Sequence, residues 1–107
     1  MISFTTLRKA NNKRQKEWPG SENASLEYRT IELAGESGEA CEAVKKYLRS
    51  KDGIKGSQAT ILDIESELAD VIIAVDLLAK KLDIDLGQAV VKKFNHTSKK
   101  YDLKTRL

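Results

Sequence analysis

The chain has 107 residues, of which 33% are charged and only 6% aromatic, and its net charge is +3. This length is enough for a single domain, residues 1–107, with one modest core. One proline and six glycines provide too few tight turns for an all-β protein, so we expect an all-α fold. The single cysteine, Cys41, excludes an internal disulfide and is typical of a cytoplasmic protein; we expect it to be a small core residue.

Targeting and membrane segments are not expected from the sequence. Residues Met1–Arg8 lack the apolar region of a secretory signal. The longest apolar run, Val71–Ala79, contains Asp76 and is too short to cross a bilayer. We therefore expect a cytoplasmic protein without membrane partners.

Four helices are predicted in chain order. Pro19 and its polar neighbours separate the first helix from the second, and the polar stretch 50–57 forms a loop before the third. The third helix is apolar nearly all round between Val71 and Ala79, so it is either central or packed against another subunit. These helices predict a four-helix bundle. The expected helices, each with its capping residue first, are Ser3 to Glu17, Ser25 to Arg49, Thr60 to Leu82 and Asp85 to Tyr101.

Two of these helices carry matching stripes of acids. In each stripe a carboxylate is followed by a second four residues later and by a third after three more, so all three share one helix face. Apolar residues that we expect to be buried lie on the adjoining arc of each helix. The acids are Glu32, Glu36 and Glu39, then Asp63, Glu67 and Asp70; the apolar residues are Leu33, Ala40, Val44 and Leu48, then Ile64, Val71, Val75 and Ala79.

Acids at the edge of a buried face indicate a bound cation. Burying ionised carboxylates without partners is costly, and converging acids raise one another's pKa unless a cation neutralises them. Oxygen ligands favour a hard divalent ion, Mg²⁺ or Mn²⁺. His96 is the only histidine, which argues against histidine-based zinc and di-iron sites. The alternative is that both stripes are ordinary solvated helix faces.

At this point the sequence resembles the MazG-like, all-α nucleoside triphosphate pyrophosphohydrolases. The resemblance depends on Glu36-x-x-Glu39 in "ELAGESGEACEAV" and Glu67-x-x-Asp70 in "ESELADVIIAVDLLAKKLDIDL". The segment "AVVKKFNHTSKKYDLKTRL" is similar to the closing helix of that family.

The resemblance implies a Mg²⁺-dependent enzyme that cleaves a nucleoside triphosphate into the monophosphate and pyrophosphate, often to clean the nucleotide pool. Short members favour deoxynucleotides, commonly deoxycytidine triphosphate, and assemble as homodimers or homotetramers that would complete the bundle. The implied metal ligands and catalytic residues are Glu36, Glu39, Glu67 and Asp70. The implied substrate-binding residues are Lys93, Asn95 and Tyr101 for the phosphates, and Arg14 and Trp18 for the base or sugar.

Two other functions are weighed against this enzyme. A non-catalytic helical module that binds a nucleotide or a protein partner would share the same fold. A nucleic-acid binder would use the basic residues at the two ends of the chain, but no recognition helix or alternation of basic and aromatic residues supports it. We therefore expect a nucleotide substrate rather than nucleic acid.

Overall fold

The computed structural model describes all residues, 1–107, and contains helices but no strands, which confirms the all-α prediction. None of the helices combines the length and the apolar character that a membrane span requires. The elements are α1 (Phe4–Glu17), the short 3₁₀ helix η1 (Ser21–Asn23), α2 (Leu26–Asp52), α3 (Ile61–Lys81) and α4 (Leu86–Lys100).

The predicted capping residues begin all four α-helices. In each case the side chain of the cap accepts a backbone N–H from the first turn, as expected for Ser3, Ser25, Thr60 and Asp85. The capping box at α3 is complete, and the hydrogen bond from the Thr60 backbone N–H lowers the pKa of Asp63. Helix α2 extends three residues past its predicted end and stops at Gly53, whose φ of 69° suits a left-handed cap.

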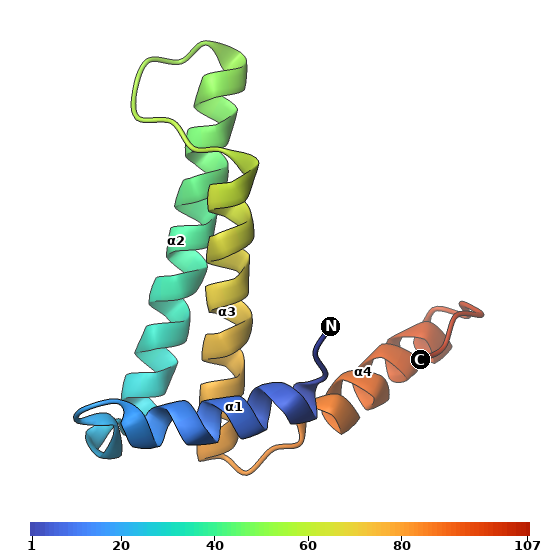
Figure 1. Cartoon of the computed structure of the whole chain (residues 1–107). Coiled ribbons are helices and arrows are strands. Elements are labelled where there is room, and N and C mark those ends of the chain that lie inside the picture. The colour runs from blue at the N-terminus through green and yellow to red at the C-terminus, as the bar shows by residue number, and fades with distance from the viewer.

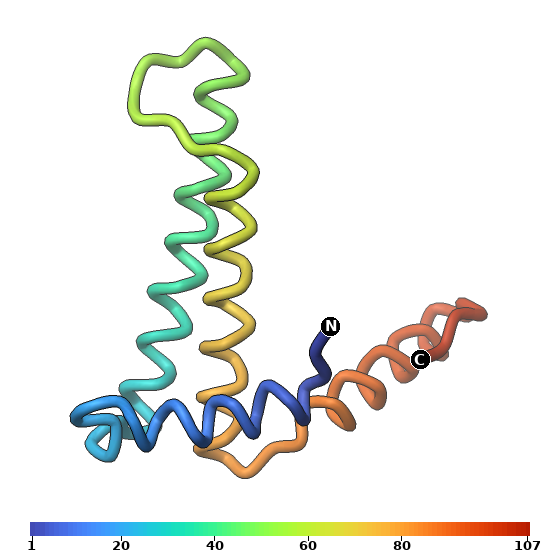
Figure 2. Tube along the Cα trace, viewed as in Figure 1, coloured from blue at the N-terminus to red at the C-terminus, as the bar shows by residue number.

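Helices α2 and α3 form a long antiparallel hairpin (Figure 1). Helix α1 lies across the end of the hairpin where α2 begins and α3 ends, and it packs on α3. Helix α4 contacts α1 and extends away from the hairpin, while the loop 53–60 closes the opposite end (Figure 2). The four expected helices are therefore present, but one chain does not close them into a compact bundle. Completion of the bundle by further chains stays a prediction.

The core of the single chain is small and consists mainly of alanine. Ten of 107 residues are buried, and the apolar ones are Ala24, Ala40, Ala43, Ala74, Leu77 and Ala79. Small side chains of this kind let two helices pack closely, but they bury little apolar area.

Three residues are more exposed than the sequence predicted. Val44 and Leu48 were expected on the buried arc but are 40% and 45% exposed, because only α3 packs against this half of α2. Cys41 was expected in the core but is exposed. It follows the buried Ala40 and so points about 100° away from that buried face.

A buried carboxylate, Asp76 of α3, joins three parts of the chain. It is 0% exposed and accepts hydrogen bonds from Arg8 Nε and Asn11 Nδ2 of α1, each at 2.9 Å. Arg8 also donates to the backbone oxygen of Ile84, in the turn before α4, at 2.9 Å. This network fixes α1 against α3 and holds the turn from which α4 starts.

Candidate active site

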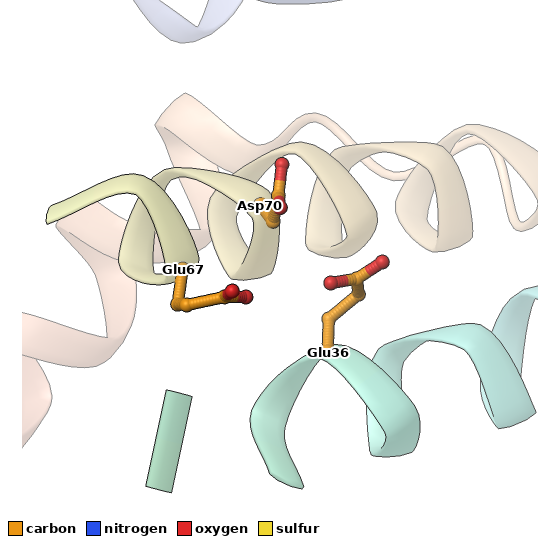
Figure 3. A group of neighbouring side chains, drawn as sticks. All are labelled: Glu36, Glu67 and Asp70. Carbon is orange, nitrogen blue, oxygen red and sulfur yellow. The ribbon is translucent and has the colours of Figure 1, made fainter. Parts of the chain in front are cut away.

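Three acids from the two stripes meet between the hairpin helices. Glu36 of α2 and Glu67 and Asp70 of α3 each offer a carboxylate oxygen, and these oxygens lie within 4.8 Å of one another. Glu36 and Glu67 extend into the space between the helices (Figure 3). Antiparallel pairing of α2 and α3 brings the two stripes together, so the expected convergence of acids from neighbouring helices is present.

The fourth predicted ligand, Glu39, lies beside this group rather than within it. It is exposed, one turn further along α2 than Glu36. A hydrogen bond with Glu39, partial burial and the negative charges of Glu39, Asp70 and Glu67 raise the pKa of Glu36 to about 6. The site is therefore strongly electronegative and favours the binding of a proton or a cation.

The oxygens of this acidic group suit a hard cation. One oxygen of Glu36 and one of Glu67 are buried and have no hydrogen-bond partner within the chain. Buried polar atoms normally have partners, so these two oxygens require a donor or a positive charge. Three carboxylates without histidine or thiolate match the ligands that Mg²⁺ or Mn²⁺ prefers.

The first acid of each stripe has a different environment from the others. Glu32 accepts a hydrogen bond from Arg29 Nη1 at 3.0 Å. Asp63 accepts from Thr60 in the α3 cap at 2.7 Å. Only the second and third acids of each stripe, with Glu39 at the margin, remain available for a cation.

A pocket of about 410 Å³ extends from the acidic group toward α1. Glu36 and Asp70 lie among its lining residues. Arg14 and Trp18, which the sequence predicted at the base or sugar, also line it, and Trp18 is 59% exposed. The structure thus places these two predicted residues in the same pocket as the acids.

The remaining predicted residues lie on or after α4, outside this pocket. Lys93 borders a separate, open apolar hollow on α4. Asn95 is bonded to the chain terminus: its Oδ1 accepts from the Leu107 backbone N–H at 2.8 Å. Tyr101 follows the helix as its exposed C-cap. A single chain does not bring these three residues to the acids.

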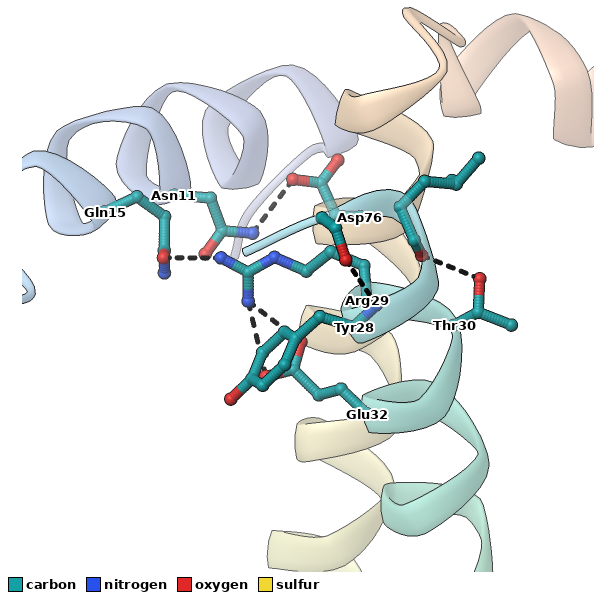
Figure 4. Close-up of polar contacts among 9 residues, drawn as sticks. Asn11, Gln15, Tyr28, Arg29, Thr30, Glu32 and Asp76 are labelled. Carbon is teal, nitrogen blue, oxygen red and sulfur yellow. Dashed lines mark hydrogen bonds and ion pairs between the residues drawn. The ribbon is translucent and has the colours of Figure 1, made fainter. Parts of the chain in front are cut away.

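Sequence reasoning missed three residues that shape the pocket. Arg29 is buried, and its guanidinium lies between Gln15 of α1 and Glu32 of α2 (Figure 4). Tyr28 lies beside it, with its ring 5.6 Å from the Arg29 guanidinium carbon. The spacing of Arg29, Glu32 and Glu36 at three and four residues was the signal available in the sequence. The contribution of Gln15 had no comparable signal, because it comes from a different helix.

Comparisons with known proteins agree with this arrangement. The family model described as the MazG nucleotide pyrophosphohydrolase domain matches residues 25–102. The chain is 39% identical over 77 residues to the Gene 37 protein of Mycobacterium phage L5, an alignment that covers 72% of this chain and 67% of that protein. No solved structure matches the chain significantly. The matched region includes all four acids and the whole of α4, while α1 precedes it.

Proposed function

The chain belongs to the MazG family of nucleotide pyrophosphohydrolases, and from this premise we propose that it is a Mg²⁺-dependent enzyme that hydrolyses a nucleoside triphosphate to its monophosphate and pyrophosphate. The observation that carries the proposal is the convergence of Glu36, Glu67 and Asp70, two of which have a buried oxygen without a partner. The adjoining pocket, with an exposed tryptophan in its wall, has room for a nucleotide base.

In this proposal Glu36, Glu67 and Asp70 hold the cation, and Glu39 joins them or assists from beside Glu36. Mg²⁺ or Mn²⁺, when bound, neutralises the acids and polarises the phosphates. The acids keep the triphosphate at this end of the pocket only through a cation, because they would otherwise repel it. A carboxylate of the group accepts the proton that the attacking water loses as the α–β phosphate anhydride is cleaved.

We assign Arg14 and Trp18 to the base and sugar end of the substrate. Trp18 offers an exposed aromatic face on which a base can stack, a contact that any base can make. Arg14 supplies a positive charge on the same wall of the pocket. Arg14 lies in α1 and Trp18 is the C-cap of that helix. Because α1 is anchored by Asp76, we propose that residues 1–107 act as one domain.

Lys93, Asn95 and Tyr101 are proposed to reach the phosphates from a second copy of the chain, in a homodimer or homotetramer. Helix α4 extends away from the α2–α3 hairpin, which carries the acids of the same chain (Figure 1). Large apolar residues remain exposed on the other helices, as expected for surfaces that pack in an assembly. The most exposed aliphatic residues on the hairpin helices are Ile31, Ile61, Leu62 and Leu68.

The test is the release of pyrophosphate from a panel of ribo- and deoxynucleoside triphosphates, with Mg²⁺, with Mn²⁺ and with a chelator. We expect metal-dependent release and a preference for deoxynucleotides, with deoxycytidine triphosphate among the substrates, in keeping with removal of surplus nucleotides. If no triphosphate is hydrolysed with either metal, the chain is a binding module of the same fold instead.

A further inference from the structure

We infer that the pocket selects its base through two side chains, Gln15 and Glu32. It favours bases whose Watson–Crick edge carries an amino group, at position 4 of a pyrimidine or position 6 of a purine, beside an unprotonated ring nitrogen. Cytosine and adenine have this edge, whereas uracil, thymine and guanine present a carbonyl oxygen beside a protonated nitrogen. The inference rests on the proposed function, because it takes the base of a nucleotide to occupy the pocket between Trp18 and the acids.

The amide of Gln15 has a fixed orientation. Its Oε1 accepts a hydrogen bond from Arg29 Nη2 at 2.8 Å. A guanidinium only donates, so the amide cannot rotate by 180° without placing two donors against each other. Arg29 is itself 6% exposed and is held by Glu32, so it cannot easily move away. The Nε2 group of Gln15 donates to no other residue and is left as a donor for a ligand.

Glu32 provides a hydrogen-bond acceptor on the same wall of the pocket. Its carboxylate accepts from Arg29 Nη1 at 3.0 and 3.3 Å, one distance to each oxygen. These bonds use part of its accepting capacity, because an ionised carboxylate has about four lone-pair positions. Arg29 therefore holds an obligate donor, Gln15 Nε2, and an obligate acceptor, Glu32, on its two sides (Figure 4).

An amino-bearing base edge offers one donor and one acceptor, the hydrogen-bonding partners that these two groups lack. The amino group donates to the Glu32 carboxylate, and the neighbouring ring nitrogen accepts from Gln15 Nε2, as acids and amides do when they read bases elsewhere. A base with a carbonyl oxygen at that position would bring two acceptors together at Glu32. Asn23 and Tyr28 of the same pocket can donate or accept and so do not discriminate. Arg14 can only donate, and in this arrangement it faces the sugar rather than the base edge.

The test uses two matched pairs of non-hydrolysable triphosphates. The first pair is the α,β-methylene analogues of dCTP and dUTP, in which the pyrimidine carries an amino group or a carbonyl oxygen at the same position. The second pair is the corresponding analogues of dATP and dITP, which differ in the same way on a purine. Affinities are measured calorimetrically on the full chain with Mg²⁺, and pyrophosphate release from the four natural triphosphates is measured in parallel. We expect tighter binding of the amino member by about tenfold to a hundredfold, the usual value for a hydrogen-bonded base edge.

Two variants assign the effect to the residues. Glu32→Gln can donate as well as accept, so the preference for the amino member should fall to near unity. Glu27→Gln is the matched control, because Glu27 is an exposed acid in the first turn of the same helix, outside the pocket. Gln15→Met removes the donor, so it should weaken the binding of the amino-bearing analogue of each pair and leave the binding of the carbonyl analogue unchanged. Thermal unfolding of each variant confirms that it is folded.

The outcomes separate this inference from the proposed function. Hydrolysis without discrimination in either pair, or a preference that survives in Glu32→Gln, overturns the inference and leaves the enzyme assignment standing. If the amino-bearing analogue is preferred within one pair and both members of the other pair bind weakly, the inference is supported. The pair that binds then identifies the preferred ring as a pyrimidine or a purine. Failure of all four analogues to bind, together with absence of hydrolysis, overturns both.

Discussion

The α2–α3 hairpin and helix α4 differ in what fixes their functional side chains. In the hairpin, Glu36 and Glu67 are brought together by packing within one chain, through buried alanines on both helices. In α4, Lys93 and Asn95 belong to a helix that packs on α1 and bonds to the terminal Leu107 but does not pack on the hairpin. One half of the proposed site is therefore formed within a single chain, whereas the other half is proposed to come from a neighbouring chain.

The largest expected effect is the loss of the acidic group in the hairpin. Glu67→Gln keeps the size of the side chain but removes the charge of a half-buried carboxylate, so pyrophosphate release should fall by a factor of about a thousand. Mn²⁺ binding, followed by electron paramagnetic resonance, should weaken in parallel while the helical content is unchanged. Glu65→Gln, an exposed acid of the same helix, is the control and should behave as the native chain does. Native rates in Glu67→Gln would contradict the proposed metal site.

A second large effect should follow from breaking the network that anchors α1 and the turn before α4. Asp76→Ala leaves the buried amide of Asn11 and the guanidinium of Arg8 without their acceptor. We expect the free energy of unfolding to fall by about 3 kcal/mol, as when one partner of a buried polar network is removed. Urea denaturation measures the change, with Glu65→Ala as the exposed control. A loss below about 1 kcal/mol would show that α1 is held mainly by its apolar contacts.

Subunit complementation tests whether α4 acts in another chain. Lys93→Ala should lower activity about tenfold, because one charge that offsets the phosphates is lost. When Lys93→Ala is co-assembled with Glu67→Gln, a dimer that shares its sites would have about a quarter of its sites intact, well above the mean of the two variants. Co-assembly of Glu36→Gln with Glu67→Gln is the matched control and should recover nothing, because both acids come from one hairpin. Absence of recovery in the first mixture would place Lys93 outside the site.

The sequence predicted the helices well because their signals are local. Ser3, Ser25, Thr60 and Asp85 all act as the expected caps, and such a cap needs only the backbone N–H groups of the turn that follows it. The burial of Val44 was predicted wrongly, since helical periodicity gives the direction of a side chain but not whether a third helix covers it.

The acidic group could also be predicted, whereas the wall of the pocket could not. Glu36 and Glu67 lie in two copies of one pattern, so pairing the helices was enough to bring them together. Gln15 and Arg29 meet only because α1 crosses the end of the hairpin, and no short-range pattern encodes that crossing. Contacts between helices far apart in sequence are the part of the site that required the structure.

The smallest expected effect is a pH dependence of stability that comes from Glu36. Its pKa is raised from 4.5 to about 6, chiefly by Glu39, so the folded chain holds this proton more tightly than the unfolded chain does. As the pH rises between 4.5 and 6, the unfolded chain loses the proton first, and the free energy of unfolding should therefore fall across that window. The full shift corresponds to at most about 2 kcal/mol, and solvent screening at this open site makes the effect smaller.

Urea denaturation in the presence of a chelator, at pH values from 4 to 7, measures this fall in the free energy of unfolding. The difference between the native chain and Glu36→Gln separates the contribution of Glu36 from the contributions of the other acids. Glu65→Gln should keep the native slope. Such a fall would mean that the packing of α2 on α3 holds the carboxylates together against their mutual repulsion, so that a cation relieves a cost already present in the fold. If Glu36→Gln keeps the slope, the acids separate when they are charged. In that case the hairpin does not pre-form its half of the site, and its difference from α4 disappears.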